Sequence, residues 1–201
     1  MRAGVGVPGS HDSITCYNPP DLGPAVIKSD QLTYRAVQFI RALRARPDLV
    51  ETEQLRPYLS AAQITLFRQM QASEQAHACA VLHQLLENGQ DHPDLMAAAL
   101  LHDVGKSIYP LRLWERVLIV VVTKIWPDLA KHLGRSAPRL CTRPFIVAEQ
   151  HAGWGAALAS RVGVSPLGSA IIRRHQEPID TSPESLEDSL LLSLQTADNN
   201  N

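Results

Sequence analysis

The chain has 201 residues, of which 45% are hydrophobic, and its 19 Lys and Arg nearly balance its 20 Asp and Glu. This length fits one compact domain, and a net charge of −1 lacks the positive field that non-specific nucleic-acid binding requires, so we expect no nucleic-acid partner. Three widely spaced cysteines are too few for a disulfide framework, which favours a reducing compartment and predicts a cytoplasmic protein.

The N-terminal part of the chain differs from the rest. Residues 1–30 contain several prolines and glycines and no sustained hydrophobic period, so we predict a flexible arm without a secretion signal. From residue 31 onward, apolar residues recur every three or four positions, which predicts an all-α domain over residues 31–201. The apolar run from Val117 to Val122 is far too short for a membrane span, so no transmembrane segment is expected.

Capping residues, prolines and glycines mark the boundaries of the predicted helices. In chain order they are Gln31–Ala45, a helix opened by a capping box of Ser60 and Gln63, Glu74–Glu87, a helix from Pro93 to Gly105, Leu113–Lys124, a short helix from Pro127, Phe145–Val162, a helix from Ser165 and Pro166 that ends before Pro178, and a last helix from Ser182 and Pro183 to Asp198. The helix from Pro93 contains the unbroken apolar run Leu95–Leu101, so we expect it at the centre of a compact bundle.

The Leu113–Lys124 helix has more than one interpretation. Its apolar residues, together with Trp114, Trp126 and the basic Arg116, are compatible with a helix that lies on a membrane surface. The same residues are compatible with a buried helix or with a lid over a binding cleft.

Ionisable residues interrupt the apolar faces of the predicted helices at four positions. His102 and Asp103 close the central helix, where burial and the helix dipole both disfavour a carboxylate that has no cation beside it. Asp198 lies on the apolar stripe of the last helix, and His77 lies on the inner face of its own helix. We predict that these four residues form a metal site, because imidazole and carboxylate groups bind Mn, Fe, Mg, Ni, Co or Zn ions.

These residues resemble a known pattern. His77, the segment Ala-Ala-Leu-Leu-His102-Asp103-Val-Gly-Lys106 and Asp198 are similar to the H…HD…D pattern of the HD-domain metal-dependent phosphohydrolase superfamily. The resemblance covers residues 60–198 and is strongest with the HDIG subgroup. It implies a helical bundle that holds one or two divalent metal ions and hydrolyses phosphomonoesters or phosphodiesters, commonly of nucleotides.

Two further histidines fit the version of this family that holds two ions. His151 and His175 stand in segments that resemble those of the HD-GYP proteins, although no Gly-Tyr-Pro segment follows His175. The resemblance then implies that Asp103 bridges two ions, with His77, His102 and Asp198 on one ion and these two histidines on the other.

The substrate expected from this resemblance is a small phosphorylated molecule of the nucleotide class. We predict catalytic roles for Asp103 and Lys106, with Lys106 and Arg174 as cations that contact the substrate phosphate. One alternative is a site with a single ion, in which His151 and His175 line the cleft. Another is a non-catalytic HD-like module that binds a nucleotide or a partner protein and uses a metal ion structurally.

Overall fold

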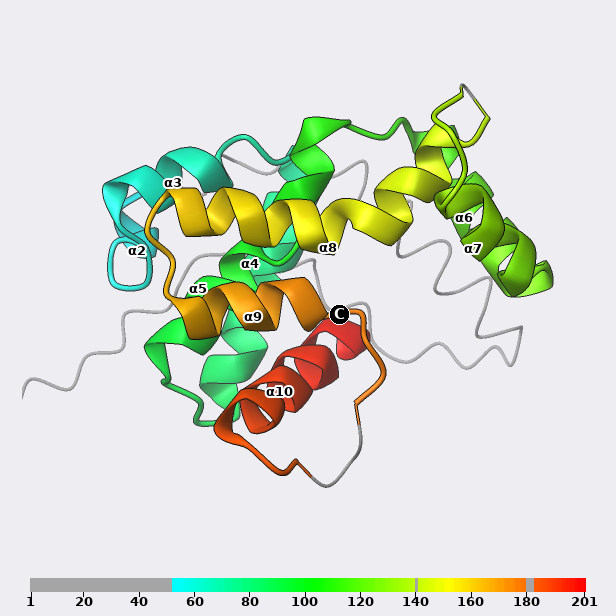
Figure 1. Cartoon of the computed structure of the whole chain (residues 1–201). Helices are drawn as coiled ribbons and strands as arrows, with labels where there is room; N and C mark the ends of the chain where they lie inside the picture. Colours follow the sequence, from blue (N-terminus) through cyan, green and yellow to red (C-terminus); the bar gives the residue numbers. More distant parts are fainter. Residues whose placement is uncertain (1–51, 140, 180–182) are drawn as a thin grey trace, which may run out of the picture.

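The computed structural model describes residues 52–139, 141–179 and 183–201, and these parts of the chain fold into helices without any strand (Figure 1). The predicted all-α bundle is confirmed for them. The predicted arm of residues 1–30 and the predicted helix Gln31–Ala45 lie outside the described residues. Among the described helices, none combines the length and the hydropathy that crossing a bilayer would require.

The described helices have the following bounds. In chain order they are α2 (Thr52–Leu55), α3 (Ala61–Phe67), α4 (Ala72–Glu87), α5 (Pro93–Leu101), the 3₁₀ helix η1 (Val104–Ile108), α6 (Leu113–Ile125), α7 (Pro127–Gly134), α8 (Arg143–Arg161), α9 (Pro166–Arg174) and α10 (Leu186–Asn200). The predicted capping box is present, because the Ser60 amide donates to Gln63 Oε1 at 2.9 Å and the Gln63 amide donates to Ser60 Oγ at 3.4 Å.

The α5 helix forms the centre of the bundle, as its all-apolar sequence predicts. Every side chain from Leu95 to Leu101 is buried. The helix packs against α4, α9 and α10, and α8 lies across η1 and α9 (Figure 1). A helix that is apolar on all sides is stable in water only when neighbours cover all of its faces. The C-terminal end of α5 is therefore placed deep in the molecule.

Two predicted helix boundaries are wrong. The α5 helix ends at Leu101 and not at Gly105. The chain continues as the 3₁₀ helix η1, in which the backbone of Gly105 packs closely against the backbone of α8. The last helix does not begin at Ser182 and Pro183. It begins at Leu186, where Ser185 is the N-cap and its Oγ accepts a hydrogen bond from the Asp188 amide at 3.1 Å.

The α6 and α7 helices pack against each other and against α8 at one end of the bundle (Figure 1). Glu115 is the one residue of α6 that is buried, whereas most of the large apolar side chains of this helix are exposed. The interpretation of Leu113–Lys124 as a buried helix is therefore wrong.

Candidate metal centre

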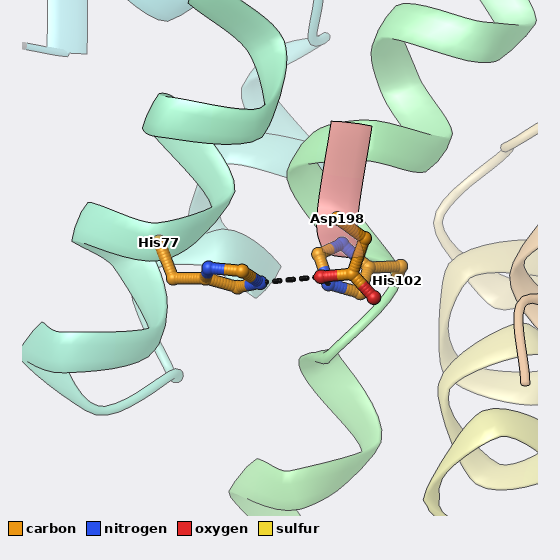
Figure 2. Close-up of side chains that lie close together, drawn as sticks. All are labelled: His77, His102 and Asp198. Carbon is orange, nitrogen blue, oxygen red and sulfur yellow. Dashed lines mark hydrogen bonds and ion pairs between the residues drawn. The ribbon is translucent and has the colours of Figure 1, made fainter. Parts of the chain in front are cut away.

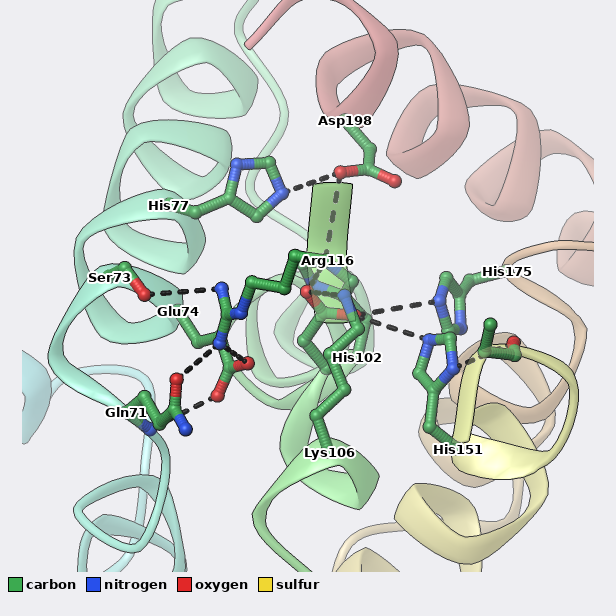
Figure 3. Close-up of polar contacts among 12 residues, drawn as sticks. Gln71, Ser73, Glu74, His77, His102, Lys106, Arg116, His151, His175 and Asp198 are labelled. Atoms are coloured by element: carbon green, nitrogen blue, oxygen red, sulfur yellow. Dashed lines mark hydrogen bonds and ion pairs between the residues drawn. The ribbon is translucent and has the colours of Figure 1, made fainter. Parts of the chain in front are cut away.

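The structure brings together all six residues that the sequence predicts as metal ligands (Figure 3). His77, His151 and Asp198 project from α4, α8 and α10, whereas His102 and His175 cap the C-terminal ends of α5 and α9 and Asp103 follows His102 directly. The six side chains form two groups of three, and within each group the ligand atoms lie within 4.8 Å of one another. Whether these groups bind metal stays a prediction.

The first group consists of His77, His102 and Asp198 (Figure 2). Asp198 Oδ1 lies 2.7 Å from His77 Nε2 and 3.7 Å from His102 Nε2. The side chains of His77 and Asp198 are 29% and 30% exposed, whereas His102 is buried. This group is therefore reachable from solvent on its His77 and Asp198 side.

The second group consists of Asp103, His151 and His175, all of which are buried. Asp103 Oδ1 lies 3.4 Å from His151 Nε2 and 3.9 Å from His175 Nε2. The second carboxylate oxygen of the same residue, Oδ2, lies 3.7 Å from His102 Nε2 in the first group. Asp103 thus presents one oxygen to each group, which is the arrangement expected of a bridging ligand.

The rings of the three buried histidines are held by backbone carbonyl oxygens of the preceding helical turn. The Nδ1 atoms lie 2.9 Å from Ala99 O for His102, 2.9 Å from Val147 O for His151 and 2.7 Å from Ile172 O for His175. Because a carbonyl oxygen only accepts hydrogen bonds, each Nδ1 carries a proton and donates it. The neutral ring then directs an unprotonated Nε2 into the site, which is how metal-binding histidines are commonly oriented.

Several polar atoms at the centre of the cluster have no hydrogen-bond partner. His102 Nε2, His151 Nε2 and Asp103 Oδ1 are buried and unsatisfied, although a buried polar atom without a partner typically costs about 1–3 kcal/mol. These atoms are all acceptors when the histidines are neutral, so they cannot satisfy one another. Two ligand atoms on one ion at about 2.1 Å lie roughly 3.0–3.4 Å apart, close to the spacing observed here. The residues therefore fit a divalent metal ion.

The charge state of the carboxylates also suits metal binding. Burial by itself would raise the pKa of Asp103, but the pKa is held well below its usual value, chiefly by the Lys106 ammonium. For Asp198, burial is likewise outweighed, chiefly by the hydrogen bond with His77, so its pKa is lowered. Both carboxylates are therefore ionised at neutral pH.

His102 and His175 are both neutral at neutral pH. Burial lowers the pKa of His102 despite the opposing charge of Asp103. Burial, with a smaller contribution from the neighbouring His102, lowers the pKa of His175 to about 3. Metal ions require neutral imidazole and ionised carboxylate, and these residues are already in those states.

The two predicted substrate-binding cations have different surroundings. Lys106 lies beside the cluster, with its Nζ 2.6 Å from Asp103 Oδ2. Arg174 is held elsewhere, because its guanidinium forms ion pairs with Glu177 at 3.2 Å, Glu187 at 2.5 Å and Asp188 at 3.0 Å. The structure therefore brings Lys106 to the site and does not bring the Arg174 side chain there.

The close approach of η1 to α8 sets the distance between the Asp103 and His151 ligands. A Cβ atom on Gly105 would lie 1.9 Å from the backbone oxygen of His151 and 2.7 Å from the amide nitrogen of Gly155. Only glycine leaves room for this contact, which lies two residues after Asp103.

The sequence prediction missed a buried ion pair next to the cluster. Glu74, one helical turn before His77 on α4, lies 2.6 Å from a guanidinium nitrogen of Arg116 on α6, and the same guanidinium contacts Gln71 and, at 3.3 Å, Ser73 (Figure 3). Burial raises the pKa of Glu74 although Arg116 opposes that shift. The signal available in the sequence was the position of Glu74 on the inner stripe of α4.

A cleft of about 320 Å³ opens beside both ligand groups. His175 and Asp198 line it, together with Glu177, Pro178 and the uncharged polar residues Gln176, Gln195 and Asn199. Gln195 is held in place, because its amide nitrogen donates to the carbonyl oxygens of His175 at 3.0 Å and Glu177 at 2.7 Å. The cleft gives a small polar molecule a route to the cluster.

No protein family, curated protein or solved structure matches this chain in the comparisons with known proteins. Any assignment of activity therefore depends on the geometry of the site and on the sequence pattern that carries it.

Proposed function

We propose that the protein is a metal-dependent phosphohydrolase that cleaves a phosphomonoester or phosphodiester bond of a small molecule of the nucleotide class. The observation that carries this proposal is the pair of ligand groups joined by Asp103, with unsatisfied buried acceptor atoms directed into the space between them. Divalent ions in such a site supply Lewis acidity and a water nucleophile at neutral pH.

The residues of the chain have separate tasks in this proposal. His77, His102 and Asp198 would hold one ion, and His151 and His175 would hold a second ion that shares Asp103 with the first. The carbonyl contacts of the buried rings keep the Nε2 lone pairs in place before any ion binds. Such preorganised ligands need little rearrangement on binding.

Lys106 would bind the phosphoryl group of the substrate. Its ammonium already lies against Asp103 and its side chain is 28% exposed, so a substrate oxygen could reach it from solvent. An ammonium there would neutralise charge that develops on the phosphoryl oxygens during cleavage. Arg174 has no part in this proposal because three carboxylates occupy its guanidinium.

The size of the cleft supports a small substrate. Its volume of about 320 Å³ lies at the lower end of the range for sites that bind small molecules. The amide side chains of Gln176 and Asn199 offer donors and acceptors suited to sugar hydroxyls or base edges. We keep the cytoplasm as the proposed location, because Cys141 is exposed and forms no disulfide within the described residues.

Hydrolysis of generic substrates tests the proposal. The full chain, reconstituted with Mn²⁺, Fe²⁺, Co²⁺, Ni²⁺, Zn²⁺ or Mg²⁺ in turn, is assayed with p-nitrophenyl phosphate and bis-p-nitrophenyl phosphate. We expect metal-dependent release of nitrophenol that Asp103→Asn lowers at least about a hundredfold, because the variant loses the shared ligand. Asp91→Asn, which changes an exposed aspartate before α5, is the matched control and should keep full activity.

The alternative function is a non-catalytic module that uses a metal ion structurally. In that case the ion pair of Lys106 with Asp103 would serve to neutralise the buried carboxylate and not to bind a substrate phosphate. If metal binds but neither substrate is cleaved with any of the ions, the site is a structural or ligand-binding one and the hydrolase proposal is wrong.

A further inference from the structure

An apolar surface on α6 and the start of α7 is exposed to solvent. The side chains on it are between 42% and 57% exposed, and we call this surface the α6 face. Its members are Leu113, Trp114, Val117, Val120, Val121, Ile125, Trp126 and Leu129. Soluble domains rarely expose so many contiguous large apolar side chains unless a lipid or protein surface covers them.

Two charged side chains and three half-buried apolar ones, Leu118, Ile119 and Val122, lie on the inward side of α6. Glu115, which is 3% exposed, faces inward and lies 3.5 Å from the guanidinium of Arg143 on α8. Arg116 reaches α4 through its ion pair with Glu74. The two ion pairs help to fix the rotation of the helix, which leaves the α6 face toward solvent.

The charge around the α6 face is positive. The exposed charged residues between positions 112 and 135 are Arg112, Lys124, Lys131 and Arg135 against Asp128, whereas the whole chain has a net charge of −1. Lys124 and Lys131 are exposed and have no carboxylate partner among the described residues. Lys124 lies four residues after Val120 and seven after Val117, in the middle of the apolar side chains.

We propose that the α6 face docks on an anionic lipid surface, with α6 lying along the interface between headgroups and acyl chains. Tryptophan is a residue preferred at that interface, and Trp114 and Trp126 stand at the two ends of the helix. The Lys124 side chain would extend its ammonium to the lipid phosphates while its methylene chain stays among apolar groups. The inference is independent of the proposed hydrolase activity.

The position of Lys124 favours lipid over a second copy of the chain. Packing two α6 faces together would bury this ammonium, and α6 offers it no carboxylate, because Glu115 lies on the opposite side. A buried charge without a partner is strongly unfavourable. An anionic lipid surface supplies the missing counter-charge.

Vesicle flotation of the full chain tests the proposal. We expect the protein to float with vesicles of phosphatidylcholine and phosphatidylserine, to float much less with phosphatidylcholine alone, and to be released as salt concentration rises. Replacing Trp114, Val121 and Ile125 together by serine should lower the partition coefficient at least about tenfold. Leu186→Ser changes an apolar side chain that is 58% exposed at the start of α10, and should leave binding unchanged.

A second pair of variants tests how much the charge of Lys124 contributes to vesicle binding. Lys124→Gln should lower the partition coefficient about fivefold, the effect expected of one basic residue near an anionic surface. Arg161→Gln, at an exposed position on α8 with no ion pair among the described residues, should not change it. Circular dichroism of each variant checks that the fold is retained.

Three results would overturn the proposal. The first is no flotation with anionic vesicles. The second is a dimer in size-exclusion chromatography that the triple serine variant dissociates, which would show that a second copy covers the α6 face. The third is a vesicle-free monomer whose Trp114 and Trp126 fluorescence is already shielded from aqueous quencher, which would show that the chain itself covers the face.

Discussion

At the scale of single residues, Gly105 controls how closely η1 approaches α8. A Cβ atom at this position would collide with backbone atoms, and backbone cannot move aside as a side-chain end can. The residue therefore couples the stability of the fold to the distance between Asp103 and His151.

We expect Gly105→Ala to lower the free energy of unfolding by about 3 kcal/mol, because the helix-to-helix contact must open to admit a methyl group. Urea denaturation followed by circular dichroism measures the loss. Gly153→Ala is the control, because a Cβ there has no atom within 4 Å and alanine favours the α8 helix. Equal stability of Gly105→Ala and the original protein would show that η1 does not rest on α8 as described.

The buried histidines predict how the metal-free protein responds to acid. The pKa of His175 is about 3 in the folded protein, below the value of 6.5 for an exposed histidine. Between these two values the unfolded chain binds a proton that the folded chain does not, so stability falls as pH falls below 6.5. From pH 7 to pH 5 this residue should remove about 2 kcal/mol from the free energy of unfolding.

Chemical denaturation of the chelator-treated protein at pH 7 and pH 5 measures this effect. His175→Gln should show a smaller loss between the two pH values than the original protein, whereas His132→Gln, at an exposed position, should show the same loss. If all three proteins lose stability equally, the folded protein does not keep His175 neutral.

The sequence indicated all six cluster residues, but not how their rings are held. His102 and Asp103 were identifiable because they follow an unbroken apolar run, and His77 and Asp198 because they interrupt apolar stripes. The bonds from Nδ1 to carbonyl oxygens depend on ring rotation at helix ends, which no spacing rule specifies. The ion pairs of Arg174 could not be foreseen either, because its partners Glu187 and Asp188 lie on another helix.

At the scale of helices, the same Arg174 explains where α10 begins. The sequence prediction placed the start at Ser182 and Pro183, whereas Ser185 is the N-cap in the structure. The ion pairs of Arg174 with Glu187 and Asp188 fix the first turn of α10 against the end of α9, and Ser185 then caps it. A tertiary contact therefore decides a local boundary.

The ion pair of Glu74 and Arg116 joins α6 to α4. Substitutions of these two residues should therefore have non-additive effects on the free energy of unfolding. Arg116→Met should lower the free energy of unfolding by about 3–5 kcal/mol, because it leaves the buried Glu74 carboxyl without its cation. Adding Glu74→Gln to that variant should recover part of the loss. Arg161→Met serves as the exposed control, and an additive double-mutant cycle would contradict the coupling.

At the scale of the whole molecule, hydrophobic periodicity predicted the all-α class, the central position of α5 and most boundaries. It could not predict the exposure of the α6 face, because an apolar helix has the same sequence pattern whether protein, lipid or solvent surrounds it. Nor could it predict that Asp198 lies beside His77, 121 positions away in the chain, because this depends on how α10 packs against α4 and α5.

Ligands drawn from several helices make metal binding and global stability interdependent. An ion present at about 1,000 times its dissociation constant should add about 4 kcal/mol and raise the melting temperature by about 8–16 °C over the chelated protein. Differential scanning fluorimetry with and without chelator measures the shift. If the melting temperature is unchanged after metal loading has been verified, a metal ion bound at the cluster does not stabilise the packing of these helices.

The most direct measurement of the central claim is the metal content of the purified, reconstituted protein by plasma mass spectrometry. The account predicts two divalent ions per chain, a fall to one when His151 and His175 are both replaced by glutamine, and no fall when the exposed His83 and His132 are replaced in the same way. Absence of bound metal in the original protein, or two ions retained in the His151 and His175 variant, would contradict it.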